Sequence, residues 1–191
     1  NITRENSLFR YHHNKKCGII DMNGNILMEP KFKSINRFNQ YAYVADKGKN
    51  KKVILNNDFQ ETMVLKTPDI NNMYYDLGEF IMQQDSLVWF LNPTNHKYEL
   101  FNIITGKELV PAIYNSVNYF NGSICKVSKD KKCGIIDRTG NLIHPIEYEY
   151  NSSNSIALVE KPIIKEMTLL TNDDTYLIID TLGNIVLKED N

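Results

Sequence analysis

A segment of thirteen residues occurs twice in this 191-residue chain with nearly the same sequence. The run from Lys15 to Leu27 reads KKCGIIDMNGNIL, and it returns 116 residues later, from Lys131 to Ile143, as KKCGIIDRTGNLI. A repeat of this size cannot bury its apolar side alone, so copies of it must pack on one another around a shared core. We therefore expect the period of the repeat to determine the architecture of the chain.

Three weaker copies share an apolar run, then an Asp or Asn, then a turn. The five marker residues are separated by 35, 46, 35 and 43 positions, and they are Asp21, Asn56, Asn102, Asp137 and Asp180. This spacing predicts five units of about forty residues in one repeat domain over 1–191. The predicted units are 15–46, 47–84, 85–128, 129–160 and 161–191, with residues 7–12 completing the last.

Turn chemistry and apolar patterning predict an all-β chain. Helical spacing is not sustained, whereas short runs of β-branched and aromatic residues alternate with Asn-Gly, Thr-Gly, Leu-Gly and Asn-Asp pairs. Within residues 19–27, the Asp21 carboxylate can accept hydrogen bonds from backbone amides and Gly24 can take a positive φ, which is typical of a hairpin. We expect three or four short antiparallel strands in each unit.

Units of this size favour a β-propeller over a flat solenoid. The last unit ends after Ile185–Leu187 without the strand that should follow, whereas the chain begins with an unassigned strand at residues 7–11. If that strand completes the final unit, the ring closes and exposed strand edges disappear. We predict a small, about five-bladed propeller closed by the N-terminal strand; the alternative is an open stack of β-hairpin repeats.

The residues of the strong copies also carry a family resemblance. The order Lys-x-Gly-Ile-Ile-Asp, x-x-Gly-Asn, two apolar residues, Pro, an aromatic residue and Phe resembles the bacterial WG repeat, also called the KWG repeat. The resemblance is strong over 15–46 and 97–160 and weak over 50–84. Cys17 and Cys133 stand where that family has its tryptophan. The resemblance implies a β-rich repeat protein with a binding or scaffold role and supplies no catalytic residue.

The candidate binding residues are aromatic. The two long spacings contain residues 86–98 and 163–176, which we predict as extended hairpins. Aromatic side chains there could contact a protein partner or a sugar ring, and the alternative is that they fill the core. The candidates are Trp89, Phe90, Tyr98, Tyr74 and Tyr75.

The sequence offers little for catalysis or metal binding. The four histidines show no ligand spacing, and the chain contains no phosphate-binding glycine loop, nucleophile elbow or Cys-x-x-Cys pair. Cys125 and Cys133 flank a predicted turn, so a disulfide between them is one alternative and two small buried side chains are the other. We expect no enzyme activity, no metal and no cofactor.

Charge and hydropathy limit the kinds of partner that we expect. The formal net charge is −1, so nucleic acid is not an expected partner, although lysines cluster before several predicted strands. Those lysines either face an acidic partner or keep strand edges from pairing with other chains. No apolar run approaches the roughly 20 residues that span a bilayer, so membrane insertion is not expected. The chain opens with Asn1 and not Met, so we expect that an upstream segment was cut away and leave the compartment open, secretion included.

These observations predict a non-catalytic module that recognises another protein through loops of a β-repeat surface. One alternative is a secreted or surface domain that binds a carbohydrate or another small ligand. A second alternative is an inhibitor or immunity-type partner of another bacterial protein.

Overall fold

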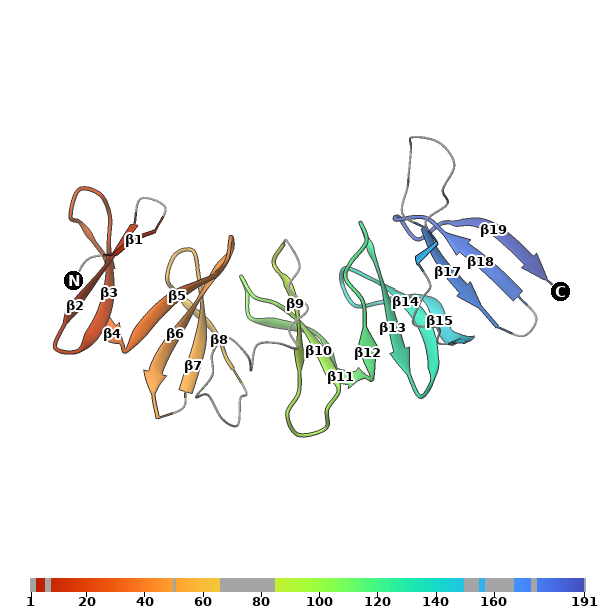
Figure 1. The fold of residues 1–191 in the computed structure, drawn as a ribbon, viewed down its shortest axis with the longest axis horizontal. Coiled ribbons are helices and arrows are strands. Elements are labelled where there is room, and N and C mark those ends of the chain that lie inside the picture. Colours follow the sequence, from red (N-terminus) through yellow and green to blue (C-terminus); the bar gives the residue numbers. More distant parts are fainter. Residues whose placement is uncertain are drawn as a thin grey trace. The chain divides into compact units, whose positions relative to one another are not determined.

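A computed structural model describes residues 3–5, 8–49, 51–65, 85–149, 155–156, 167–172 and 175–190. These residues form five antiparallel β-sheets, which we number 1 to 5 along the chain (Figure 1). The prediction of an all-β fold is confirmed. The described part of the chain contains no helix that is long and apolar enough to cross a membrane.

Each sheet is built from strands that follow one another in the sequence. Sheet 1 contains β1 (Thr3–Glu5), β2 (Leu8–His13), β3 (Lys16–Ile20) and β4 (Ile26–Phe32). Sheet 2 contains β5 (Ser34–Asn39), β6 (Ala42–Gly48), β7 (Lys51–Asn56) and β8 (Glu61–Val64). Sheet 3 contains β9 (Leu87–Leu91), β10 (Tyr98–Asn102) and β11 (Lys107–Tyr114). Sheet 4 contains β12 (Ser116–Val117), β13 (Ile124–Lys129), β14 (Lys132–Asp137) and β15 (Leu142–Glu149). Sheet 5 contains β16 (Ser155–Ile156), β17 (Met167–Thr171), β18 (Thr175–Ile179) and β19 (Ile185–Asp190).

The N-terminal strand does not complete the last sheet. Strand β2 pairs with β3, from Phe9 opposite Ile20 to His13 opposite Lys16, and sheet 5 has four strands of its own. The physical reason is a tight hairpin, because the residues between β2 and β3, Asn14 and Lys15, both have positive φ angles. The prediction that residues 7–12 complete the last repeat is therefore wrong. Closure of the ring itself stays a prediction.

The two predicted extended hairpins are regular parts of sheets. Within 86–98, the chain forms β9 and the start of β10, and β10 leads to the marker Asn102 as β3 leads to Asp21. Within 163–176, the described residues belong to β17, β18 and the turn between them. These segments therefore hold regular strands of sheets 3 and 5 rather than insertions.

The repeat array divides into two compact units. Unit 1 comprises Asn1–Glu79, Gln84–Val88 and Phe101–Lys107. Unit 2 comprises Phe80–Gln83, Trp89–Leu100 and Glu108–Asn191. The prediction of one domain over 1–191 did not anticipate this division.

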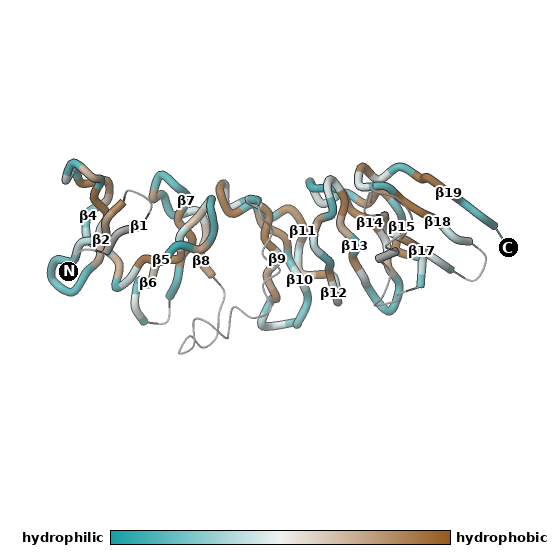
Figure 2. The backbone as a smooth tube through the Cα atoms, turned by 45° about the horizontal axis from the view of Figure 1, so that its top comes forward, coloured by the Kyte–Doolittle hydropathy of each residue, from teal (hydrophilic) through white to brown (hydrophobic). Residues whose placement is uncertain are grey.

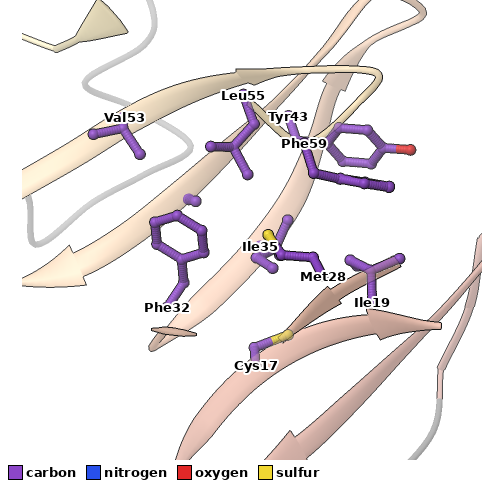
Figure 3. Close-up of a cluster of buried hydrophobic side chains, with 10 residues drawn as sticks. Cys17, Ile19, Met28, Phe32, Ile35, Tyr43, Val53, Leu55 and Phe59 are labelled. Carbon is purple, nitrogen blue, oxygen red and sulfur yellow. The ribbon is translucent and has the colours of Figure 1, made fainter. Parts of the chain in front are cut away.

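Each unit contains an apolar core between consecutive sheets. In unit 1, Cys17, Ile19, Met28 and Phe32 of sheet 1 pack with side chains of sheet 2 such as Leu55 (Figure 3). In unit 2, the corresponding core joins sheets 4 and 5, and it consists of Ile124, Cys133, Ile135, Tyr148, Leu170, Leu177 and Ile179. Since fully burying one such large apolar side chain contributes about 1.5–3 kcal/mol, these shared cores explain why the repeats fold together.

The glycine after each repeated cysteine allows a close approach of two strands. A β-carbon placed on Gly134 would lie 2.7 Å from the carbonyl oxygens of His144 and Pro145, and Gly18 has an equivalent clash with the backbone of Met28. The ladder between β14 and β15 is irregular on both sides of Ile135, as expected where one strand bulges. The Cys-Gly pair is thus a structural feature of the strand.

The three cysteines are buried and unpaired in disulfides. Cys125 lies opposite Ile136, whereas Cys133 lies opposite Ser128. Because neighbouring positions along a strand alternate between faces, Cys125 and Cys133 lie on opposite faces of sheet 4. The disulfide alternative is therefore wrong, and the alternative of small buried side chains is the one observed.

Candidate protein-binding surface

A turn in which the marker side chain accepts backbone hydrogen bonds follows the marker residue in every sheet. In sheet 5, an Asp180 carboxylate oxygen accepts hydrogen bonds of 2.9 Å from the amides of Leu182 and Asn184. The Asn184 side chain donates to the other carboxylate oxygen at 3.1 Å, and Gly183 takes the required φ of 93°. The exposed tip of the turn is therefore held in one backbone conformation.

The other markers make the same kind of turn. The Asp21 carboxylate accepts from the amides of Asn23 and Asn25, both at 2.8 Å, and the Asn56 and Asn102 side chains also accept from amides within their own turns. The hairpin predicted around Asp21 is confirmed. An amide oxygen can replace the carboxylate oxygen because the turn needs an acceptor rather than a charge.

The turn carboxylates are stabilised in their charged form. Hydrogen bonds from the Asn184 side chain and then from backbone amides lower the pKa of Asp180, and Asn25 does the same for Asp21. At Asp137, partial burial raises the pKa, but hydrogen bonds from Thr139 and Asn141 outweigh it and the pKa is lowered overall. These hydrogen bonds therefore stabilise both the turns and the charged form of their carboxylates.

Three loops of unit 2 are joined by hydrogen bonds at the end of the sheets where these turns lie. The amide of Ser123 donates to the carbonyl of Thr181 at 2.8 Å, which links the β12–β13 loop to the turn of sheet 5. The Arg138 guanidinium, in the turn of sheet 4, donates to the carbonyl of Gly122 at 3.1 Å and lies 5.1 Å from the ring centre of Phe120. The loops of two consecutive sheets therefore form one ordered surface.

Large apolar side chains are exposed on these loops and at the start of β15. The exposed fractions are 67% for Leu182, 63% for Tyr119, 53% for Leu142 and 42% for Ile143. A β-carbon placed on Gly183 would lie 3.0 Å from the Ile143 side chain, so the sheet 4 residues adjoin the sheet 5 turn. We call Tyr119, Leu142, Ile143 and Leu182 the turn surface.

The aromatic residues predicted from the sequence lie elsewhere. Trp89 is fully buried, with its ring edge-on to Tyr114 at a centroid distance of 6.2 Å, and Phe90 is also buried. Both side chains lie in the core. Tyr98 is half-buried in β10, and its binding role stays a prediction. Tyr74 and Tyr75 lie outside the described residues.

Sequence reasoning missed the turn surface although a signal was present. Leu182 follows the marker Asp180 by two positions, in a turn whose residues are expected to be polar. Met22 follows Asp21 in the first copy and is also exposed, at 63%. Apolar residues at turn positions, rather than aromatic residues in strands, were the features that indicated the exposed surface.

Several of the remaining polar groups can also be placed in the structure. Across the residues that the structure describes, no group of three or more His, Cys, Asp or Glu side chains could hold a metal ion. His144 contacts the carbonyl of Gly183 at 3.1 Å, which places one histidine in a structural contact between sheets 4 and 5. Of the predicted basic positions, Lys15 and Lys131 are exposed in tight turns, whereas Lys52 is buried.

Comparison with solved structures gives low similarity over nearly the whole chain. A crystal structure of the eukaryotic initiation factor is 12% identical with a TM-score of 0.45, and the alignment covers 99% of this chain and 53% of that one. BamB from Moraxella catarrhalis is 11% identical with a TM-score of 0.35, covering 98% and 57%. Hsv2p from Kluyveromyces lactis is 13% identical with a TM-score of 0.35, covering 98% and 63%. The chain thus spans between about half and two thirds of these structures, and at such values the likeness assigns neither a closed ring nor a function.

Comparison with family models gives a direct result. No curated protein matches the chain. The model of the WG containing repeat matches residues 18–49 and 101–133. The first match includes Gly18, Asp21 and Gly24, and the second ends on Cys133, at the cysteine position of the next strong copy. The resemblance inferred from the repeated segment is confirmed by these two matches to the WG containing repeat.

Proposed function

We propose that this chain is a non-catalytic module that binds another protein through the turn surface of unit 2. The observation that carries the proposal is the exposure of four large apolar side chains, two on loops that hydrogen bonds hold in place (Tyr119 and Leu182) and two at the start of β15 (Leu142 and Ile143). Apolar side chains gathered on one exposed surface are typical of protein–protein contact sites. Loops on a β scaffold commonly carry such sites.

The ordered turns favour binding energetically. Binding is weakened when loops and side chains must become ordered in the complex, because that ordering costs conformational entropy. A preformed surface reduces this cost. Leu182 follows an Asp180 that already holds its amide, and Tyr119 lies two residues after Val117, whose side chain is buried. A partner with a complementary apolar surface would therefore bury Leu182 and Tyr119 with little rearrangement of the backbone.

The carbohydrate alternative receives less support. Sugar binding by stacked aromatics requires exposed rings, and the burial of Trp89 and Phe90 removes two of the candidate rings. An inhibitor or immunity-type role is a special case of protein binding and would use the same surface. The identity of the captured partner distinguishes that role from a general scaffold.

The experiment is affinity capture from native cell lysate, followed by a binding titration with the purified partner. We compare the unchanged chain with Leu182→Glu and Tyr119→Ala, each checked for folding by circular dichroism. We expect each substitution to weaken binding of the partner about tenfold or more, because each removes a central apolar contact.

The chain supplies a matched control. Met22 lies in the sheet 1 turn, one residue after the marker Asp21, whereas Leu182 lies two residues after Asp180, and the two side chains are similarly exposed. Met22→Glu should leave the affinity unchanged. Equal weakening by Met22→Glu and Leu182→Glu would contradict the assignment to unit 2, and the absence of any captured partner would contradict protein binding.

A further inference from the structure

The contact between consecutive sheets repeats along the chain with the same residue positions. In unit 1, Cys17 and Ile19 of β3 face sheet 2, where Leu55 of β7 belongs to the same core. In unit 2, Cys133 and Ile135 of β14, at the equivalent positions, share a core with sheet 5. We call the side of a sheet that packs on the next sheet its forward face, and the opposite side its backward face.

The forward face of sheet 5 is apolar and exposed. Ile178 and Tyr176 lie two and four residues before the marker Asp180, as Ile135 and Cys133 do before Asp137. Leu187 pairs with Ile178 as Met28 pairs with Ile19 in sheet 1. Tyr176 and Leu187 are each 43% exposed, whereas their equivalents Cys133 and Met28 are 0% and 8% exposed. Figure 2 shows the apolar start of β19 and its polar end.

The backward face of sheet 1 is also incompletely covered. Phe9 pairs with Ile20 on this face, and both side chains are half-buried. The equivalent pair on the backward face of sheet 4, Cys125 and Ile136, is buried to 1% and 0% exposure. The backward faces of later sheets are therefore more completely covered than that of sheet 1.

We propose that the forward face of sheet 5 binds the backward face of sheet 1 in a second copy of this chain. The two faces are the two halves of a contact that the chain already makes between sheets 1 and 2 and between sheets 4 and 5. Tyr176 and Leu187 would be buried against Phe9 and Ile20. The contact joins different surfaces, so it is heterologous and each copy retains one further free face.

The test is sedimentation velocity over a range of protein concentrations. The unchanged chain should show a mass that rises with concentration in multiples of one chain. Leu187→Glu removes the forward face and Phe9→Lys removes the backward face, and each variant alone should remain a monomer. An equimolar mixture of the two should form a dimer that does not grow further, because each variant keeps the face that the other has lost.

Two further variants keep the result interpretable. Tyr176→Lys replaces Leu187→Glu if the latter unfolds, and Leu182→Glu is the control, because Leu182 lies in a turn and on neither face. Leu182→Glu should assemble like the unchanged chain, which also separates self-assembly from partner binding by the turn surface. The proposal would be overturned if the unchanged chain stayed a monomer at all concentrations, as it would if the two faces of one chain packed on each other. It would also be overturned if the two variants did not bind each other in the mixture.

Discussion

The hydroxyl of Thr62 in β8 donates a 2.8 Å hydrogen bond to the carbonyl of Ile103, in the turn that opens after β10. Gly106 closes the same turn with a φ of 72°, and a β-carbon on it would collide with the carbonyl oxygen of Thr62. A comparable contact recurs where His144 meets the carbonyl of Gly183. The marker turn of one sheet therefore packs on the last strand of the sheet before it.

Replacing Gly106 with alanine should destabilise the chain strongly. We expect Gly106→Ala to lower the free energy of unfolding by about 2–4 kcal/mol, because it adds a steric clash to an unfavourable positive φ. Urea denaturation measures the effect. Gly24→Ala is the matched control, since Gly24 also has a positive φ but no described atom lies within 4 Å of its added β-carbon. Its loss should be near 1 kcal/mol, from backbone strain alone. Equal losses for both would refute the contact.

The marker carboxylates should make the free energy of unfolding depend on pH in the acidic range. The pKa of Asp180 is lowered in the folded state, so its contribution is present above its unfolded pKa and is lost as the pH falls through the folded pKa. The loss should thus begin below about pH 4. Asp180→Asn should retain the turn, because Asn56 and Asn102 already serve at equivalent positions, and should reduce this acid dependence. Asp180→Ala should lower the urea midpoint at neutral pH. An Asp180→Asn variant with unchanged acid dependence would argue against the assignment.

The cysteines should be unreactive in the folded chain. Burial raises the pKa of Cys125 to about 12, with smaller opposing effects from the Asn118 backbone and Trp89, and burial also raises the pKa of Cys17 and Cys133. Since the thiolate is the reactive form, Ellman's reagent should modify no thiol near pH 8 until denaturant is added, and should then detect all three. Rapid native reaction of even one thiol would contradict the burial described.

Trp89 should contribute to stability and not to recognition. Trp89→Ala should lower the free energy of unfolding by about 3–5 kcal/mol, because it leaves a cavity beside Tyr114. Trp89→Phe keeps an aromatic ring and should lose less. Calorimetry gives the stabilities, and a titration of the captured partner gives the affinities. If folded Trp89→Phe loses the partner, the residue has a binding role that its burial does not explain.

Local patterns predicted the local structure well. The Asp21 and Asp180 turns, the strands on either side of them and the repeat itself follow from residues that lie close in sequence. The residue at which one repeat ends and the next begins was not predictable in the same way. A repeat can be divided at any point along its length without changing the apolar pattern. The β2–β3 hairpin also escaped notice, since Asn14 and Lys15 take positive φ angles without a glycine to indicate them.

The candidate surface was harder to predict than the fold. An aromatic residue in a strand lies on one of the two faces of its sheet, and which face packs against the core depends on the neighbouring sheet. Trp89 and Phe90 were therefore plausible surface residues in the sequence and are buried in the structure. Tyr119 and Leu182 lie in loops that contact each other through Ser123 and Thr181, a relationship between residues that lie far apart in the chain.

The pairing of each sheet from consecutive strands has a consequence for folding. Every ladder between the strands that the structure describes joins neighbours in sequence, so a sheet can form before the rest of the chain is ordered. Growth can then proceed from sheet to sheet, with each completed forward face serving as the template for the next. A chain of this kind can emerge and fold in order during synthesis, and whole repeats can be duplicated or lost without disturbing the hydrogen bonds of those that remain.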